Sequence, residues 1–371
     1  MERPNLYICH TAYQVLVDMV RAMEDAVPPE LILSSVIPNT EELAGRLSAT
    51  GLFRCVRVFD ELACGNAIQQ GFLRTLLLQR VMGRRNVEKY YGFSIRPQDY
   101  NVIYIHNDWS VLGRYLQDLK APYILCEDTM ASTCRPEHPI IDEQRKLPHF
   151  RLRQKFCYGY LYWGDYKRVT AVETECAAKT GLFPEKLRED SKSDRFHRLT
   201  ADQKALIRQV FLTRPLPEKA EGAVLFLPRD FVPDGLLDSE TQKKMFAAVV
   251  KAHCSDGPLF LKTHPRDTFD YSTLFPDAVI LERTMPSEVL NFALPFRFKK
   301  AVTVESTVLK ALEVADEKLE LSLSEALACS AEPFLRKERR ALIICSYQGF
   351  TMKSGGPLHR FYCGPARRLF L

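Results

Sequence analysis

Four polar groups in the second half of the chain each follow a short apolar run, and together they could do group-transfer chemistry. They are Asp230 after "AVLFLPR", His264 after "LFLKT", Glu282 after "DAVIL", and the pair Ser306-Thr307 after "KKAVTVE". A carboxylate can take a proton from an attacking hydroxyl, and an imidazole can donate to a departing phosphate. A Ser-Thr pair at a helix start offers hydroxyls and free backbone N–H groups to a phosphate.

Each of these residues also has an ordinary structural interpretation. Asp230 could be a turn residue, and His264 a hydrogen-bonded loop residue. Ser306 is a good helix N-cap with or without a ligand, and Glu282 could be a solvent-facing charge. Their shared place favours function, because the carboxyl ends of parallel strands meet at the edge where open α/β sheets bind ligands. Proline disfavours further strand, so the strand that begins near Leu259 should end about where His264 lies.

Alternating apolar and helix-length segments predict the sheets that would hold these groups. In the first half, strands are expected at 5–10, 30–35, 53–59, 101–106 and 122–128, with helices at 11–26, 40–50, 66–91 and 108–120. In the second half, strands are expected at 223–230, 259–265, 277–282 and 299–305, with helices near 239–253, 286–293 and from Ser306 onward. The alternation predicts an α/β protein of GT-B type, with two Rossmann-like, doubly wound domains facing a cleft.

The boundary between the two domains is expected near a stretch rich in Pro, Lys and Glu at 214–222, which has the composition of a linker. Residues 135–215 lose the alternation and read as a helical insertion. We therefore predict an N-terminal domain at 1–218, which contains the insertion, and a C-terminal domain at 219–371.

The composition is that of an ordinary globular protein. Of 371 residues, 46% are hydrophobic and 26% charged, and the net charge of +5 favours anionic partners without being large enough to predict nucleic acid. Eleven cysteines form no Cys-x-x-Cys pair and no zinc spacing, which suggests reduced thiols. No run has signal-peptide character or the roughly 18 apolar residues of a membrane span, so we expect a cytoplasmic protein. No Asp-x-Asp pair follows a strand, so neither a metal nor a cofactor is expected.

The order of these motifs resembles the donor half of bacterial sialyltransferases, especially glycosyltransferase family 52, the lipooligosaccharide and capsule sialyltransferases. That order is an Asp after a strand, the run Lys262-x-His264-Pro265-Arg266, a Glu, and a Ser-Thr pair. The start "NLYICHTAYQVLV" resembles the start of that family, and "YILCEDT" lies where the family carries an Asp/Glu-Asp-Gly motif. The resemblance leaves about 135–215 uncovered. This chain has Thr129 where that motif normally has glycine, and Arg229 where the family tends to have small residues.

The resemblance implies an inverting, metal-independent transfer of sialic acid from CMP-sialic acid to a terminal galactose-type sugar of a surface glycan. Asp230 would be the base, and His264 would face the departing phosphate. Residues 219–371 would bind the donor through Pro228, Arg229, Lys262, Pro265, Arg266, Glu282, Ser306 and Thr307. Residues 1–218 would bind the acceptor through His10, Thr11, His106, Asp108, Glu127 and Asp128.

Other functions stay open on the sequence alone. A His-Pro motif also occurs in glycerol-phosphate polymerases, so a CDP-glycerol glycerophosphotransferase or a hexosyltransferase is an alternative. Thr129 and Arg229 keep open a catalytically idle glycan- or nucleotide-binding protein. The family resemblance favours a homodimer. The basic, apolar segments 72–91 and 359–371 could lie on the inner face of the cytoplasmic membrane, near a lipid-linked acceptor, or could pack on the protein itself.

Overall fold

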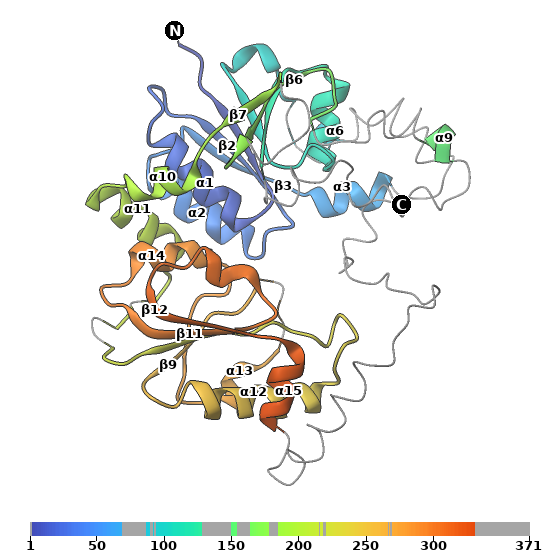
Figure 1. Cartoon of the computed structure of the whole chain (residues 1–371). Helices are drawn as coiled ribbons and strands as arrows, with labels where there is room; N and C mark the ends of the chain where they lie inside the picture. The colour runs from blue at the N-terminus through green and yellow to red at the C-terminus, as the bar shows by residue number, and fades with distance from the viewer. Residues whose placement is uncertain are drawn as a thin grey trace. The chain divides into compact units, whose positions relative to one another are not determined.

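The computed structural model of the chain forms two compact units, which divide between Val210 and Phe211 (Figure 1). The predicted boundary lies a little further along, at 218. The structure describes residues 2–68, 87–89, 92, 94–127, 150–153, 164–177, 185–214, 216–217, 220–265, 267 and 269–330. The tail at 359–371 and most of the basic segment at 72–91 lie outside these residues. Within the described part of the chain, no helix combines the length and the apolar character that a membrane crossing requires.

The first unit is built on a parallel sheet of seven strands in the order β3-β2-β1-β4-β5-β6-β7. The strands are β1 Leu6–Cys9, β2 Glu30–Ser34, β3 Cys55–Phe59, β4 Ile103–Ile105, β5 Tyr123–Cys126, β6 Val169–Thr174 and β7 Leu187–Glu189. The chain moves outward from β1 to β3 and then returns to the other side of β1 with β4. The order therefore reverses between β1 and β4, the position at which doubly wound sheets bind ligands.

Helices alternate with the strands of this unit along the chain. They are α1 Ala12–Ala22, α2 Thr40–Ala49, α3 Glu61–Ile68, α6 Val111–Asp118, α9 Phe150–Arg153, α10 Lys192–His197 and α11 Ala201–Phe211, with a 3₁₀ turn η2 at Pro97–Asp99. Thr11 caps α1, since its Oγ1 accepts a hydrogen bond of 3.2 Å from the Gln14 backbone N–H. Helix α1 packs against α10, and α3 packs against α6.

Strands β6 and β7 lie in the region where a helical insertion was predicted, which corrects that prediction for the residues described there. The charged residues in and beside these strands interrupt the hydrophobic pattern expected of a strand, because they pair with other charges inside the fold. Glu173 of β6 and Asp190, which follows β7, both form ion pairs with the buried Arg21 of α1. A polar sequence thus forms the edge of the sheet.

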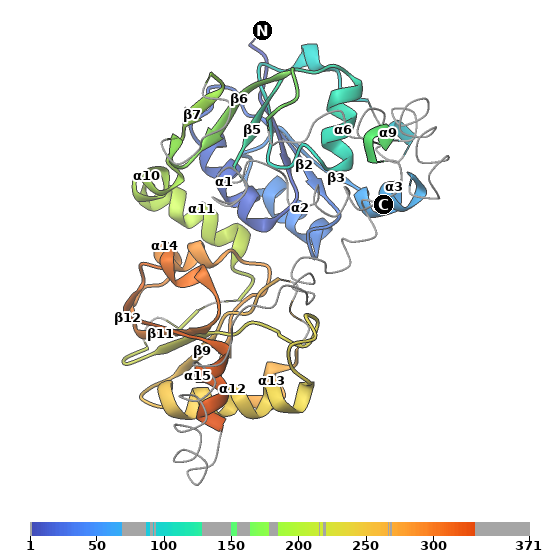
Figure 2. The ribbon, with the colours of Figure 1, turned by 45° about the vertical axis from the view of Figure 1, so that its right-hand side comes forward.

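The second unit is built on a parallel sheet of five strands in the order β10-β9-β8-β11-β12. The strands are β8 Val224–Leu227, β9 Leu259–Leu261, β10 Val279–Ile280, β11 Phe298–Val304 and β12 Ala315–Leu321. The helices are α12 Ser239–His253, α13 Tyr271–Leu274, α14 Leu290–Ala293 and α15 Leu323–Ser330, with 3₁₀ turns η5 Ser287–Val289 and η6 Thr307–Lys310. Helices α12, α13 and α15 cover one face of the sheet and α14 the other (Figures 1 and 2). Here the order reverses between β8 and β11.

Both sheets confirm the predicted α/β class with two Rossmann-like, doubly wound domains. Two details of the second sheet differ from the prediction. The helix expected from Ser306 is only the four-residue turn η6, and the chain then forms the unpredicted strand β12. That strand, "ADEKLEL", exposes charged side chains at the edge of the sheet. Charges at an edge protect it from pairing with further strands. The same charges make the sequence look like a loop or a helix.

Candidate functional site

The loop that follows β8 places Asp230 at the carboxyl edge of the second sheet. Phe231 is fully buried and anchors the loop in the core. The Asp230 carboxylate accepts two hydrogen bonds on one oxygen, Oδ1, from Nε2 of Gln242 at 2.9 Å and from the backbone N–H of Val232 at 3.1 Å. The carboxylate is therefore held in place at the surface of the edge. Pro228, which precedes the loop, is buried and does not face solvent.

Arg229 joins the two loops that flank the point where the strand order reverses. Its guanidinium forms an ion pair of 2.8 Å with Asp234 and donates a hydrogen bond of 3.4 Å to the backbone carbonyl of Glu305, beyond β11. About a third of the side chain is exposed (34%), so a positive charge stands at this position of the edge.

Glu305 has a backbone φ of 47°, in the left-handed region that residues other than glycine seldom adopt. Its own side chain stabilises the turn by accepting a hydrogen bond of 3.2 Å from the Leu323 N–H. Strained backbone of this kind is concentrated at functional sites. The turn presents Ser306, whose Oγ accepts a bond of 3.4 Å from the Val308 N–H. Because η6 is so short, the expected cradle at the start of a long helix is replaced by this turn, which Thr307 begins.

His264 lies in the loop that follows β9, three residues after the strand ends at Leu261 rather than at the strand end itself. The residue is exposed, and its backbone carbonyl accepts a hydrogen bond of 3.0 Å from the Asp267 N–H. The following Pro265 is half-buried. The imidazole is thus carried by an ordered loop on the edge and is not packed in the interior.

Lys262, one of the predicted donor contacts, is engaged by the backbone of two loops in this structure. Its side chain is buried, and Nζ donates to the backbone carbonyls of Thr263 at 2.6 Å and Arg283 at 3.1 Å. Burial lowers the pKa of this amine to about 8, although acidic neighbours, Glu288 first, act in the opposite direction. The amine therefore ties the loop after β9 to the loop after β10.

Glu282 follows β10 and is half-buried. One carboxylate oxygen accepts a hydrogen bond from the Thr213 hydroxyl, and the other accepts one of 3.2 Å from the Thr284 hydroxyl. The side chain is oriented but already engaged by two hydroxyl donors. Each carboxylate oxygen can accept a second hydrogen bond, so a ribose hydroxyl could bind beside these donors.

The strand order brings four of the predicted groups to one edge. Glu282, His264, Asp230 and Ser306 follow β10, β9, β8 and β11, which are consecutive neighbours in the sheet. Adjacent strands lie roughly 4.8 Å apart, so these groups share an edge about three strand spacings wide. Burial raises the pKa of Asp267 in the His264 loop, and the charge of Asp230 adds to that rise. Arg266 lies outside the described residues.

In the first unit, His10 follows β1 at the point where the strand order reverses. Its Nε2 lies 3.3 Å from a carboxylate oxygen of Glu61, and the ring is largely buried. Glu61 also accepts hydrogen bonds from the Ser34 hydroxyl and, at 2.7 Å, from the Val111 N–H. Burial alone would raise the pKa of Glu61, but His10 and these donors outweigh it and lower the pKa. Nδ1 of His10 is buried without a hydrogen bond from any described residue.

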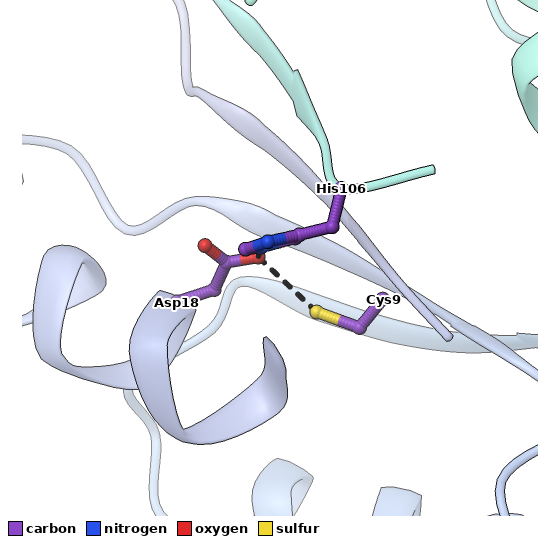
Figure 3. A group of neighbouring side chains, drawn as sticks. All are labelled: Cys9, Asp18 and His106. Atoms are coloured by element: carbon purple, nitrogen blue, oxygen red, sulfur yellow. Dashed lines mark hydrogen bonds and ion pairs between the residues drawn. The ribbon is translucent and has the colours of Figure 1, made fainter. Parts of the chain in front are cut away.

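His106 follows β4 and lies in a buried cluster with Asp18 of α1 and Cys9 of β1 (Figure 3). Asp18 Oδ2 lies 3.1 Å from His106 Nε2 and 3.1 Å from Cys9 Sγ. Such a set of N, O and S atoms could hold a transition metal. The Arg21 guanidinium, 3.6 Å from Asp18 Oδ1, already supplies a positive charge there. We assign no metal to the cluster, in which the thiol and the imidazole are hydrogen-bonded to the carboxylate.

Asp108 and Glu127, expected to contact an acceptor, are buried and bonded within the protein. Asp108 accepts a hydrogen bond of 3.0 Å from the Tyr123 hydroxyl, and burial raises its pKa to about 7. Glu127 accepts bonds from the Thr174 hydroxyl at 3.0 Å and from the Glu175 N–H at 2.6 Å. With His106 they support the edge from inside, and they present no surface to a sugar in this structure. Asp128 and Thr129 lie outside the described residues.

Two residues that organise the structure, Arg21 and Gln242, were not identified from the sequence. Arg21 gathers Glu173 and Asp190, more than 150 residues further along, and also donates a bond of 2.8 Å to Cys126 Sγ. Gln242 is an ordinary helix residue by sequence. One cue could have predicted the Arg21 cluster: an arginine at a buried position of an amphipathic helix needs a buried partner.

Comparisons with known proteins give distant likenesses. No protein-family model matches the chain. A stretch of 74 residues is 31% identical to an uncharacterized protein of Haemophilus influenzae, and it covers 20% of this chain and 24% of that protein. The matched part thus spans about a quarter of that relative.

Among solved structures, an α/β-galactoside α-2,3-sialyltransferase from Photobacterium phosphoreum is similar, with a TM-score of 0.48 and 14% identity over 89% of this chain and 95% of that one. A UDP-GlcNAc 2-epimerase from Methanocaldococcus jannaschii has a TM-score of 0.42 and 13% identity over 93% of this chain and 99% of that one. Neither likeness assigns a reaction to this chain.

Proposed function

We propose that the protein is an inverting, metal-independent sialyltransferase that moves sialic acid from CMP-sialic acid to a terminal galactose-type sugar of a bacterial lipooligosaccharide or capsule. The motif order of the second half supports this reaction. The observation that carries it is the placement of Asp230 and His264 after adjacent strands, beside the point where the second sheet reverses its order. That position suits a nucleotide-linked donor.

In this proposal, the acceptor hydroxyl attacks the anomeric carbon as the bond to the CMP phosphate breaks, and Asp230 takes the hydroxyl proton. Base catalysis of this kind contributes roughly 10²- to 10⁴-fold in rate. His264 donates to a phosphate oxygen, which gains negative charge as the bond breaks, so the contact is strongest in the transition state. Arg229 and Ser306 hold the phosphate, and Glu282 accepts from the ribose hydroxyls.

We place the acceptor on the first unit, at the loop after β1. His10 and Glu61 form a buried pair, with Nε2 3.3 Å from a carboxylate that accepts from the Ser34 hydroxyl and the Val111 N–H, so the imidazole is held at the loop after β1. Thr11 stands beside it but is committed to capping α1. A His10→Ala variant is expected to raise KM for the acceptor while leaving hydrolysis of the donor in water unchanged.

The proposal extends to a homodimer and to a peripheral contact with an anionic membrane that presents a lipid-linked acceptor. Light scattering of the purified chain measures its oligomeric state. Flotation with anionic liposomes, compared between the full chain and a chain without 359–371, measures its binding to the membrane.

Donor hydrolysis tests the reaction directly. The protein is incubated with CMP-sialic acid, CDP-glycerol and UDP-hexoses, first without and then with a lactose acceptor. Release of CMP from CMP-sialic acid, lost in Asp230→Asn, is the expected result, and NMR of the product should show inversion at the anomeric carbon. Turnover of CDP-glycerol or a UDP-hexose alone would instead identify the alternative transferases. Nucleotide binding without turnover would identify an idle binding protein.

A further inference from the structure

We propose that Gln242 is a positioning residue that fixes the Asp230 carboxylate so that Oδ2 takes the proton from the acceptor. This role rests on the proposed transferase function. Gln242 lies in the first turn of α12 and is fully buried (0% exposed). Its Oε1 accepts a hydrogen bond of 2.7 Å from the Phe231 N–H, and its Nε2 donates one of 2.9 Å to Asp230 Oδ1.

The backbone of the loop decides which way the amide points. A backbone N–H can only donate, so the atom of Gln242 that faces Phe231 must be the oxygen. The nitrogen is then forced toward Asp230, as a donor at a fixed place. Nearly all the freedom of a glutamine side chain is removed by burial and by this one bond.

Both hydrogen bonds to Asp230 end on the same oxygen. Oδ1 accepts from Gln242 and from the Val232 N–H, whereas Oδ2 accepts none from any residue that the structure describes. Donation to one oxygen stabilises the ionised carboxylate and prevents its rotation. A base must be ionised before it can take a proton, so the remaining oxygen is left oriented for that step.

The surroundings of Asp230 carry charges of both signs. Asp267, in the loop after β9, accepts a hydrogen bond of 2.7 Å from the Tyr271 hydroxyl, and the charge of Asp230 adds to the burial that raises the pKa of Asp267. Arg229 is the adjacent cation, but its guanidinium is paired with Asp234. The Gln242 amide therefore remains as the side-chain donor to the Asp230 carboxylate among the described residues.

The first unit holds a related arrangement. Gln14 lies in the first turn of α1, is 1% exposed, and accepts a hydrogen bond of 2.6 Å from the His10 N–H. In both units a buried glutamine of the first helix thus fixes the loop after the first strand. In the second unit the glutamine also donates to a carboxylate, and that bond is the part that we assign to the reaction.

The test compares Gln242→Glu with a control on the same helix, Lys244→Gln, which lowers the net charge by the same amount at an exposed position. The glutamate keeps an acceptor for Phe231 and replaces the donor to Asp230 with a second carboxylate. We expect kcat/KM for CMP-sialic acid to fall roughly 10- to 100-fold at neutral pH. The acid limb of its pH profile should move up by about one pH unit or more, because a like charge favours the protonated form. Lys244→Gln should keep the wild-type profile.

An active Gln242→Glu protein with the wild-type acid limb would overturn the role of Gln242 while leaving the transferase function intact. A wild-type protein that turns over no nucleotide-linked donor would overturn both. If Gln242→Glu does not fold, Gln242→Met decides, because it removes the donor to Asp230 Oδ1 without adding a charge. A lower kcat/KM with an acid limb moved up supports the contact, and a wild-type acid limb contradicts it.

Discussion

Asp230 and His264 follow the neighbouring strands β8 and β9 and lie on the same edge of the second sheet. Asp230 is fixed by hydrogen bonds from a helix and from its own loop, whereas His264 is exposed on a loop tied to the next strand connection through the buried amine of Lys262. One residue is thus set as an acceptor of protons, and the other lies at the exposed surface of the same edge. The predictions below test this division.

Replacing Asp230 with asparagine should remove the base and leave the donor site. We expect kcat to fall roughly 10²- to 10⁴-fold, and CMP should raise the melting temperatures of the variant and of wild type equally. Asp256→Asn is the matched control, because Asp256 is exposed and pairs only with Lys299 at 3.4 Å among the described residues. Asp230→Asn with full activity would show that another group takes the proton.

Replacing His264 should cost less than replacing Asp230, since a phosphate is a good leaving group without help. We expect His264→Ala to lower kcat roughly 10- to 100-fold and His264→Gln, which still donates, to recover part of the loss. Thermal unfolding should not change, because the residue is exposed. His253→Ala, at the far end of α12, is the control. Equal losses in the alanine and glutamine variants would argue against a role as donor.

The buried amine of Lys262 should make the free energy of unfolding rise with pH above neutrality. Burial lowers its pKa to about 8 in the folded protein, against 10.5 for the ordinary amine. Below pH 8 the folded state carries the full cost of the buried charge, and this cost is relieved as the pH rises from 8 to 10.5. Wild type should therefore gain about 3 kcal/mol of unfolding free energy relative to Lys262→Met across that range. Urea unfolding at pH 7.5 and pH 10 measures the gain, and a constant difference between the two proteins would contradict it.

The buried carboxyl of Asp108 should make the free energy of unfolding fall as the pH rises toward 7. Burial raises its pKa to about 7 in the folded protein, against the ordinary 3.8. The folded state keeps a proton that the unfolded chain has released, so this residue lowers stability as the pH rises toward 7. Asp108→Asn can still accept from Tyr123 and should gain about 3 kcal/mol relative to wild type between pH 5 and pH 8. Denaturant unfolding at both values measures it, and parallel stability curves would exclude a buried proton at Asp108.

The sequence predicted the parts of the fold that depend on local patterns. The apolar runs that became β1, β2, β8 and the second half of β11 are buried on both faces, so they stand out as continuous hydrophobic stretches. Proline after His264 located the end of a strand to within a few residues. The edge strands β7 and β12, and β6 beside β7, were missed because they carry paired or exposed charges, which a pattern of hydrophobicity does not distinguish from loop or helix.

The sequence predicted which residues lie at the sheet edges better than it predicted what their side chains contact. A residue type after a strand places a side chain on an edge, but it does not say whether the side chain faces solvent or the core. His106, Asp108 and Glu127 lie at the expected strand ends and are buried there, because their partners come from segments as distant as Asp18 and Thr174. Such pairings are long-range and leave no local pattern.

A crystal structure of the protein with bound CMP would locate the donor site. We expect the phosphate to lie within hydrogen-bond distance of the Ser306 hydroxyl and the His264 imidazole, with the ribose next to Glu282. CMP bound on the first unit, or a phosphate away from the loops that follow β8, β9 and β11, would contradict it.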